Sequence, residues 1–347
     1  VANIDPCIAL TEFLLNSDLP KDVDIRVMAY HSRQVLLLRS EQEKHLDSVL
    51  KRKEKDGEIP LPFKNKVIRH HIDNSTAKNI VFILVATPVE EVGRDHDFDW
   101  SIIEPSSYRS IVQLAGRILR HRHKSIKTPN IAIMQYNLRA LKKESPAYTM
   151  PGFETHDLFK LDSHDMDILL EGTDYENRIN AIPRIKRKSR LRKEDRFADL
   201  EHAVMENALT NYSRKKIDTL EGWVSGAWWF LGLPQKCNTF RESEAIRRYF
   251  LKYDDGNLYF VEFDDDGENF KSELNITHQK NSDEHPRLWL KRSFKESLKH
   301  LKEMERFKDL SKQKLSLRFG EITIRESERD TMFEYSDQFG LKKLKNK

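Results

Sequence analysis

Short apolar runs alternate with helix-like segments over the first 140 residues of the chain. The runs are almost continuously apolar, a pattern typical of strands that are covered on both faces. They predict four strands, at residues 25–30, 80–86, 101–104 and 131–136. The segments between them predict three helices, at residues 7–15, 39–52 and 107–122. Because strand–helix alternation favours a parallel sheet with helical crossovers, we expect an α/β fold for residues 1–140.

The pattern changes beyond residue 140. Residues 145–173 are polar and irregular, and they contain the breakers Pro146, Pro151 and Gly152. Further on, the chain predicts helices at 194–209 and 294–310, and a hairpin of strands 246–253 and 258–263 around Asp255 and Gly256. We therefore expect an α/β domain at 1–140, a helical linker at 141–215 and a smaller α+β domain at 216–347.

Length and composition exclude several classes of protein. The 347 residues, 38% of them apolar, are enough to bury a core in two domains. The longest apolar run, 80–86, is far shorter than the roughly 20 residues of a membrane span. No signal peptide is visible, and two cysteines cannot build a disulfide scaffold or a cysteine-rich zinc site. These features predict a cytoplasmic protein. The net charge of +4 excludes no partner.

Three short segments carry candidate chemistry. The segment YHSR at 30–33 ends the first predicted strand, and TPVEEVGRDHD at 87–97 directly follows the most apolar one. In open parallel sheets, ligands bind beyond the carboxyl ends of the strands, and these two segments occupy that position. The third segment, QLAGRILR at 113–120, lies in a predicted helix.

The third segment predicts an anion clamp. On a helix, Gln113, Gly116, Arg117 and Arg120 would share one face because they are spaced three or four residues apart. Gly116 would let that face approach another surface closely. Two guanidiniums one turn apart, beside a glutamine, are suited to holding a phosphate.

These segments resemble motifs IV, V and VI of superfamily 2 helicases, in which motif V reads T-x-x-x-E-x-G-x-D-x-D and motif VI reads Q-x-x-G-R-x-x-R. The longer strings VATPVEEVGRDHDFDW, EPSSYRS and QLAGRILRHR resemble those of the CRISPR-associated helicase–nuclease of type I systems, in its type I-F form. The string ANIDP at 2–6 resembles the first strand-to-helix turn of the second RecA-like domain of that family. The resemblance is strong over residues 1–136.

The resemblance implies a RecA-like parallel sheet with flanking helices, and it implies roles for individual residues. Arg117 and Arg120 would contact the γ-phosphate of ATP, and Gln113 would help to couple two RecA-like lobes. Gly93 and Asp95 would lie near the nucleotide ribose. The residues that would contact the backbone of single-stranded DNA are Thr87, His31 and Ser32.

Other parts of such an enzyme are missing from this sequence. It contains neither the phosphate loop G-x-x-x-x-G-K-[ST] nor the D-E-x-H box. The family's HD nuclease domain and its N-terminal Cas2-like domain are missing as well. We therefore expect a C-terminal part that is inactive alone, shares ATP with an absent first RecA-like domain, and meets Mg²⁺ or another divalent metal only through absent domains.

The implied partners are single-stranded DNA, the RNA-guided type I-F surveillance complex and, through the Cas2-like domain, the spacer-acquisition integrase. No membrane partner is expected. Two alternatives stay open at this stage: the second lobe of another superfamily 2 translocase, and a non-catalytic DNA-binding module.

Several other patterns have simpler interpretations. Three His-Asp pairs, at 96–97, 156–157 and 164–165, do not predict a metal site, and the acidic stretch at 262–273 is read as a turn rather than a calcium loop. The aromatic cluster at 223–230 is expected in a core. Seven of the ten residues 184–193 are basic, and they would either track phosphates or form a flexible linker. Cys7 is expected in a core.

Overall fold

The structure is a computed structural model that describes residues 1–55, 57–91, 93–122, 126–210, 219–226, 232, 245–254, 257–263, 270–278 and 284–344. The chain divides into two compact units. Unit 1 contains Val1, Asn3–Asp97 and Glu244–Lys347, and unit 2 contains Ala2 and Phe98–Ser243.

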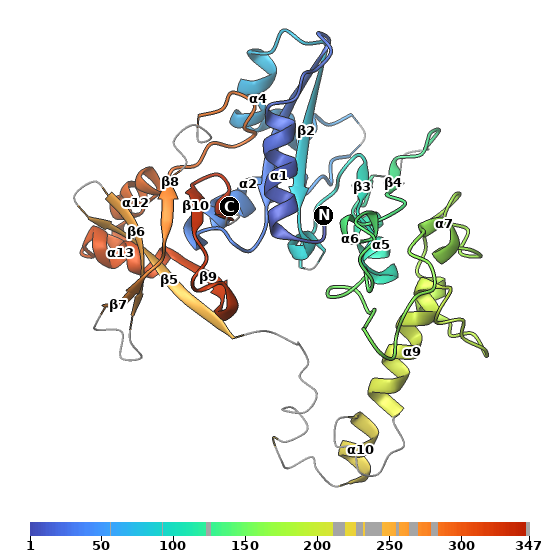
Figure 1. Ribbon diagram of the computed structural model, residues 1–347. Helices are drawn as coiled ribbons and strands as arrows, with labels where there is room; N and C mark the ends of the chain where they lie inside the picture. The colour runs from blue at the N-terminus through green and yellow to red at the C-terminus, as the bar shows by residue number, and fades with distance from the viewer. Residues whose placement is uncertain are drawn as a thin grey trace. The chain divides into compact units, whose positions relative to one another are not determined.

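A pair of parallel strands forms the centre of the N-terminal part of unit 1 (Figure 1). Strands β1 (Val23–Tyr30) and β2 (Asn79–Ala86) pair along their whole length, with Tyr30 opposite Ala86. Helix α1 (Ile4–Leu15) packs against them through a shared apolar core. The crossover contains helices α2 (Leu36–Leu50), α3 (Leu61–Lys64) and α4 (Lys66–Asp73). Both strands and a helical crossover were predicted, and they are confirmed.

The other edge of β1 is occupied by a segment from much later in the chain. The Val27 N–H donates to the Arg287 carbonyl at 2.8 Å, and the Trp289 N–H donates to the Val27 carbonyl at 3.0 Å. Leu288 forms a parallel bridge with Val27. Residues 287–289 therefore extend the pair of strands, although their sequence shows no strand pattern.

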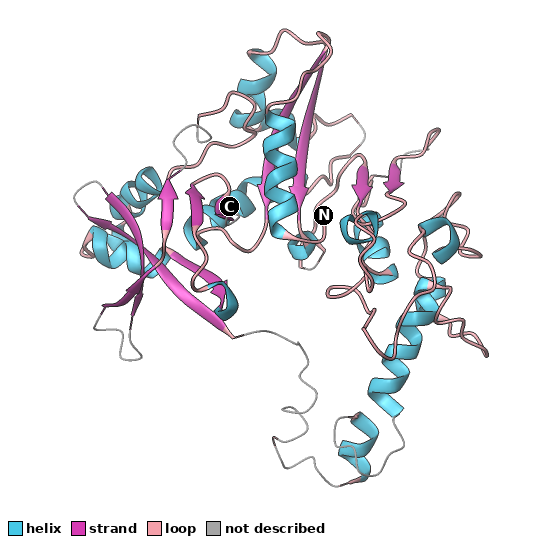
Figure 2. Ribbon diagram, viewed as in Figure 1, coloured by secondary structure: helices cyan, strands magenta, loops and turns pink. Residues whose placement is uncertain are grey.

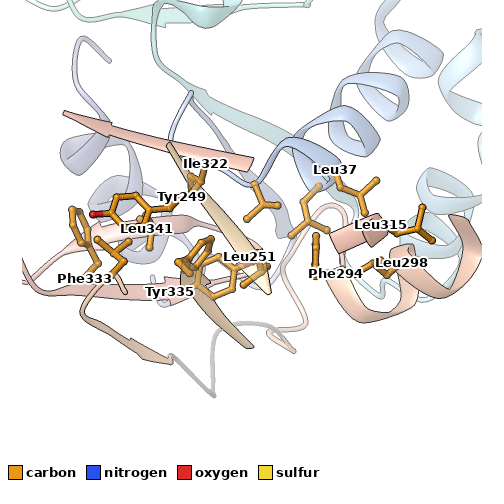
Figure 3. Close-up of a cluster of buried hydrophobic side chains, with 14 of the residues drawn as sticks. Leu37, Tyr249, Leu251, Phe294, Leu298, Leu315, Ile322, Phe333, Tyr335 and Leu341 are labelled. Carbon is orange, nitrogen blue, oxygen red and sulfur yellow. The ribbon is translucent and has the colours of Figure 1, made fainter. Parts of the chain in front are cut away.

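Two further sheets fill the C-terminal part of unit 1. One has the order β7-β6-β5-β9, made of Phe270–Glu273, Asn257–Phe263, Ile246–Asp254 and Glu321–Arg325. The other has the order β11-β10-β8, made of Gly340–Lys343, Phe333–Ser336 and Ile276–His278. Helices α12 (Phe294–Glu303) and α13 (Lys312–Phe319) pack on these strands. Their core includes Val35, the N-cap residue of α2, and Leu37 and Leu38 from its first turn. Figure 3 shows Leu37 within this core.

One predicted helix of this region is shorter than expected. The prediction extended a helix over residues 294–310, but α12 ends at Glu303. Met304 has an extended backbone with ψ of 134°, and a short 3-10 turn at Glu305–Phe307 follows. The apolar spacing continues beyond Glu303 because Met304, Phe307 and Leu310 still face the same core from that turn.

Unit 2 has a second pair of parallel strands, β3 (Ser101–Ile103) and β4 (Ile131–Ile133). The helices are α5 (Tyr108–Ala115), α6 (Leu138–Leu141), α7 (Met166–Leu169), α8 (Ile182–Ile185), α9 (Phe197–Thr210) and α10 (Leu220–Ser225). Long loops connect β4 to α9, as Figure 2 shows. Tyr108, Tyr148 and Phe197 join these loops to α5 and α9 in one apolar core.

The predicted α/β class is confirmed as a mixed α/β fold. A single RecA-like sheet and the boundaries at 140 and 215 stay predictions. Trp228, Trp229, Phe230 and the Asp255–Gly256 turn lie outside the described residues, as do the side chain of Trp223 and residues 264–269 of the acidic stretch. Among the helices that the structure describes, none combines the length and apolar character that crossing a bilayer requires.

Candidate nucleotide and nucleic-acid site

Two of the three candidate segments start side by side. Because β1 and β2 are parallel and Tyr30 lies opposite Ala86, both strands end at the same edge. The Thr87 N–H donates to the Tyr30 carbonyl at 3.0 Å, so the pairing continues one residue beyond β2. The predicted position of these segments, each beyond the carboxyl end of a parallel strand, is confirmed.

The first segment presents its residues very differently. Ser32 is exposed, whereas His31 is fully buried. The Nδ1 atom of His31 accepts the Arg33 N–H at 3.2 Å, and Nε2 has no hydrogen-bond partner among the described residues. Burial, together with the nearby Arg33 and Arg292 guanidiniums, lowers the pKa of His31 to about 3. The imidazole of His31 is therefore neutral and enclosed by protein. The predicted contact of His31 with DNA stays a prediction.

Arg33 fastens this segment to the C-terminal part of unit 1. Its guanidinium contacts Glu328 at 2.9 Å and Asp5 at 3.1 Å. Glu328 also forms an ion pair with the Lys343 ammonium at 2.6 Å. Burial would raise the pKa of Glu328, but the hydrogen bond from Lys343 and the charge of Arg33 outweigh it and lower that pKa. The sequence showed Arg33 only as part of a motif, and nothing in it indicated Glu328.

The second segment is a loop that leaves β2 through a 3-10 turn, η1 (Pro88–Glu90). Thr87, which precedes the turn, is 6% exposed. Gly93 is exposed with φ of +73°, and a Cβ added there would meet nothing within 4 Å. Asp95 contacts Lys53 at 2.8 Å. The positive φ explains a glycine at this position, since other residues rarely adopt it.

Helix α2 holds this loop in place through two carboxylates. His96 is buried, with Nδ1 at 2.7 Å from Glu90 and Nε2 at 3.1 Å from Asp47. Arg94 reaches Glu43 at 2.5 Å. Glu43 and Asp47 are four residues apart on α2 and so share one face. Sequence reasoning missed both, although that spacing was a usable signal.

Arg94 also joins the two segments to each other. Its guanidinium donates to the Tyr30 hydroxyl at 2.6 Å, and that hydroxyl donates to Glu43 at 2.9 Å. Burial and the neighbouring Glu43 carboxylate raise the pKa of Tyr30. Tyr30, Glu43 and Arg94 thus form one hydrogen-bonded group at the strand ends, and it fixes the base of the loop.

The third segment, in unit 2, does not have the predicted geometry. Helix α5 begins after Ser107, whose hydroxyl caps the Ser110 N–H, and ends at Ala115, with Gly116 as its C-cap. Beyond it, the Phe98 N–H donates to the Arg117 carbonyl and the Leu119 N–H donates to the Phe98 carbonyl, both at 2.9 Å. Arg117 and Arg120 therefore do not continue the helical face of Gln113. The predicted helix 107–122 is wrong beyond residue 115, because backbone pairing with Phe98 replaces it.

The three polar side chains of this segment lie in different environments. Arg117 is 5% exposed, Arg120 is exposed, and both make contacts within the protein. The Oε1 atom of Gln113 is buried and has no hydrogen-bond partner among the described residues. An unsatisfied buried acceptor costs free energy, so a donor supplied by a ligand or another part of the protein would stabilise this position.

The basic segment 184–193 is partly paired with acidic residues. Arg184 contacts Glu201 at 2.7 Å, and Arg187 contacts Glu206 at 2.8 Å, both on α9. Arg192 contacts Asp195 at 3.0 Å. These pairs reduce the charge that the segment offers to phosphates, and the choice between phosphate tracking and a linker stays open. Among the described residues, no group of three potential metal ligands is present.

Comparison with known proteins identifies the family. Residues 1–123 match the family described as "CRISPR-associated nuclease/helicase Cas3, C-terminal". A relative from Pectobacterium atrosepticum, named "CRISPR-associated nuclease/helicase Cas3 subtype I-F/YPEST", is 39% identical over 275 residues. The chain belongs to the Cas3 family, as the C-terminal part of its subtype I-F form. The resemblance drawn from the sequence is thus confirmed.

A second Cas3 relative of the same subtype, from Pseudomonas aeruginosa, is 34% identical over 359 residues. These matches cover 76% and 99% of this chain but only 24% and 31% of the relatives, so the chain spans about a quarter to a third of their length.

Solved structures also match. "Crystal structure of T. fusca Cas3-AMPPNP" matches with a TM-score of 0.27 and 20% identity, over 38% of this chain and 14% of that one. "CRISPR RNA-guided surveillance complex, pre-nicking" matches with a TM-score of 0.36 and 14% identity, over 99% of this chain and 38% of that one.

Proposed function

We propose that this chain is the C-terminal part of an ATP-dependent helicase–nuclease that moves along single-stranded DNA in type I-F CRISPR interference. It supplies the second RecA-like domain, with motifs IV, V and VI, and a C-terminal domain. The observation that carries the proposal is the meeting of segments 30–33 and 87–97 at one edge of two parallel strands, in a chain of the Cas3 family.

The strand-end loops suit contact with a nucleic-acid backbone. Ser32 and Gly93 are exposed, so hydroxyl and backbone groups of both loops are accessible to phosphate oxygens. Thr87 begins the second loop. His31 is buried and accepts the Arg33 N–H within the first loop. The Tyr30–Glu43–Arg94 group keeps the loops in register. Two loops joined in this way would contact the backbone of single-stranded DNA at a fixed distance from each other while the protein moves along it.

Motif VI suits the binding of ATP shared with another lobe. The Oε1 atom of Gln113 has no hydrogen-bond partner among the residues that the structure describes, and Arg120 is exposed. Arg120, and Arg117 after a side-chain rearrangement, would stabilise the charge that develops on the γ-phosphate. Gly93 and Asp95 would lie near the ribose. A divalent metal would be bound by other domains of the intact protein.

The proposed partners follow from the family. The surveillance complex would deliver the displaced strand, and a Cas2-like portion would contact the spacer-acquisition integrase. The isolated chain would hydrolyse no ATP, because the phosphate loop would come from the first RecA-like domain.

The test uses the intact protein that contains this chain. We expect Arg120→Ala and Arg117→Lys each to reduce DNA-stimulated ATP hydrolysis by about 10³-fold, the range measured for arginines that stabilise phosphoryl transfer. Lysine keeps the charge of Arg117 but not its fork of donors, and it limits the loss of packing at this buried position.

Arg178→Ala is the matched control, since Arg178 is an exposed arginine of the same unit outside all three segments. It should change the rate less than about twofold. Thermal unfolding of each variant checks that the fold persists. Normal ATP hydrolysis by a folded Arg120→Ala protein would exclude the assigned role.

A further inference from the structure

An open pocket of about 600 Å³ lies in unit 1 between helix α4 and the segment 286–291. Arg26, Leu288 and Trp289 are its buried lining residues, and Val67, His71 and Leu290 are partly exposed. Its exposed lining residues are Lys66, His70, Asn74, Pro286 and Lys291. None of them belongs to segments 30–33 or 87–97. The volume lies in the usual range of ligand pockets.

The lining of this pocket is basic. It contains Arg26, Lys66 and Lys291 but no carboxylate. Asp24 contacts the Nη1 atom of Arg26 at 2.6 Å and offsets part of that charge. Lys66 has no ion-pair partner among the described residues, and Lys291 donates only to the Glu284 carbonyl at 3.3 Å. Two lysine ammoniums therefore remain available to an anion.

The pocket also has hydrogen-bond donors without partners. Arg26 donates from Nε to His71 at 2.9 Å and from Nη1 to Asp24 and the Ile25 carbonyl, whereas its Nη2 has no partner among the described residues. Trp289 is 3% exposed, and its Nε1 likewise has no partner there. The Nη2 atom of Arg26 is therefore a donor that a phosphate oxygen could use, since guanidinium donors pair well with phosphate.

The base of the pocket is held rigidly. His71 accepts from Arg26 at Nδ1 and contacts the Trp289 carbonyl through Nε2 at 2.8 Å. The indole of Trp289 packs edge-on against Phe82 at a centroid distance of 5.3 Å. Backbone hydrogen bonds to β1 hold residues 287–289 in place. Lys291 follows this segment closely in the chain, so its backbone position beside the pocket is restrained as well. Such preorganisation lowers the entropic cost of binding.

We propose that this pocket binds a phosphate group, either of a free nucleotide or of the backbone of a nucleic-acid strand. Lysine and arginine donors with no competing carboxylate in the lining are the usual partners of phosphate oxygens. Lys66 and Lys291 provide the charge at the rim, and Arg26 provides the donor at the base. This site is independent of the function proposed for the strand-end loops.

The test measures hydrogen exchange of backbone amides in the intact protein, which gives a local readout. We expect thymidine 5′-monophosphate, or a short oligothymidylate without terminal phosphates, to slow exchange in peptides that cover 64–74 and 286–292. Protection by the monophosphate alone identifies a nucleotide site, and protection by the oligonucleotide identifies a backbone site. Thymidine without phosphate should give no protection.

The variant Lys66→Glu/Lys291→Glu should need about ten times more ligand for the same protection, since two charge-assisted contacts become repulsive. Both side chains are exposed, so the fold should persist. Lys21→Glu/Lys78→Glu, at exposed lysines outside the pocket, makes the same change in net charge and should bind normally. The proposal would be overturned if neither phosphate ligand gave protection, if thymidine protected equally well, or if the pocket variant bound as the wild type does.

Discussion

Gly340 packs directly on the backbone of Arg33. A Cβ added to Gly340 would come within 2.0 Å of the Arg33 carbonyl oxygen, far closer than two non-bonded heavy atoms can approach. The next residue, Leu341, donates its N–H to the same carbonyl at 3.1 Å. Gly340 also has φ of +66°. The start of β11 thus touches the loop that follows β1, where a DNA contact is proposed.

Replacing Gly340 with alanine should strongly destabilise unit 1. The substitution adds a steric overlap with backbone to the strain of a positive φ, and we expect a loss of at least about 3 kcal/mol. Urea unfolding measures it. Gly57→Ala is the control, because Gly57 has φ of +89° but nothing within 4 Å of an added Cβ. It should cost about 1 kcal/mol, and equal losses in the two variants would contradict the close approach.

The buried Arg33–Glu328 pair should make stability depend on pH. The pKa of Glu328 is lowered in the folded state, so its contribution is complete above the unfolded value near 4.5 and disappears as the pH falls below it. Glu328→Gln should therefore cost about 3 kcal/mol at neutral pH and much less in acid. Chemical unfolding at several pH values tests this.

Glu334→Gln provides the comparison for Glu328, since Glu334 lies 3.7 Å from Lys342 in a more accessible pair. It should change stability by less than about 1 kcal/mol at any pH. A Glu328 effect that stays constant from neutral to acidic pH would show that its charge contributes nothing.

Acidification should also destabilise the protein through His31. Its pKa is lowered from 6.5 to about 3, so the unfolded state takes up a proton first and stability falls as the pH drops below 6.5. At about pH 5 the loss should reach about 2 kcal/mol relative to His31→Gln, which cannot titrate in this range. His156→Gln, at an exposed histidine, should keep the slope of the wild type. Parallel pH profiles for wild type and His31→Gln would contradict the burial of a neutral ring.

Cys7 should resist modification until the protein opens. The side chain is fully buried, its Sγ donates to the Val85 carbonyl at 3.1 Å, and burial raises the pKa of the thiol to about 11. Thiolates are the reactive form, so labelling by a disulfide reagent in a Cys237→Ser background should be at least about a hundredfold slower than in urea. Rapid labelling of the folded protein would place Cys7 at an accessible surface.

Local pattern was sufficient for the elements that are governed by their own residues. The continuous apolar runs of β1 and β2 predicted both strands, and helical spacing predicted α1, α2 and α9. The apolar runs also predicted correctly that residues 30–33 and 87–97 each follow a strand of a parallel sheet, and the structure shows that the two strands are neighbours. Two parallel strands necessarily bring their carboxyl ends to one edge, so that part of the site needed no further information.

The end of α5 could not be read in this way. Residues 107–122 keep helical spacing throughout, and Gly116 alone does not end a helix. The helix stops at Ala115 because residues 117–119 exchange helical hydrogen bonds for pairing with Phe98, which precedes the helix in the chain. Competition between a local and a non-local set of backbone hydrogen bonds is not visible in a short window of sequence.

The sequence by itself thus determined the α/β class, the strands that carry the loops, and membership of a helicase–nuclease family. Only the tertiary structure decided which surfaces those loops rest on. Residues 287–289 pair with β1, Glu328 holds Arg33, and Val35, Leu37 and Leu38 share a core with strands more than two hundred residues later. These contacts join segments that lie far apart in the chain, and no periodicity in either segment encodes its distant partner.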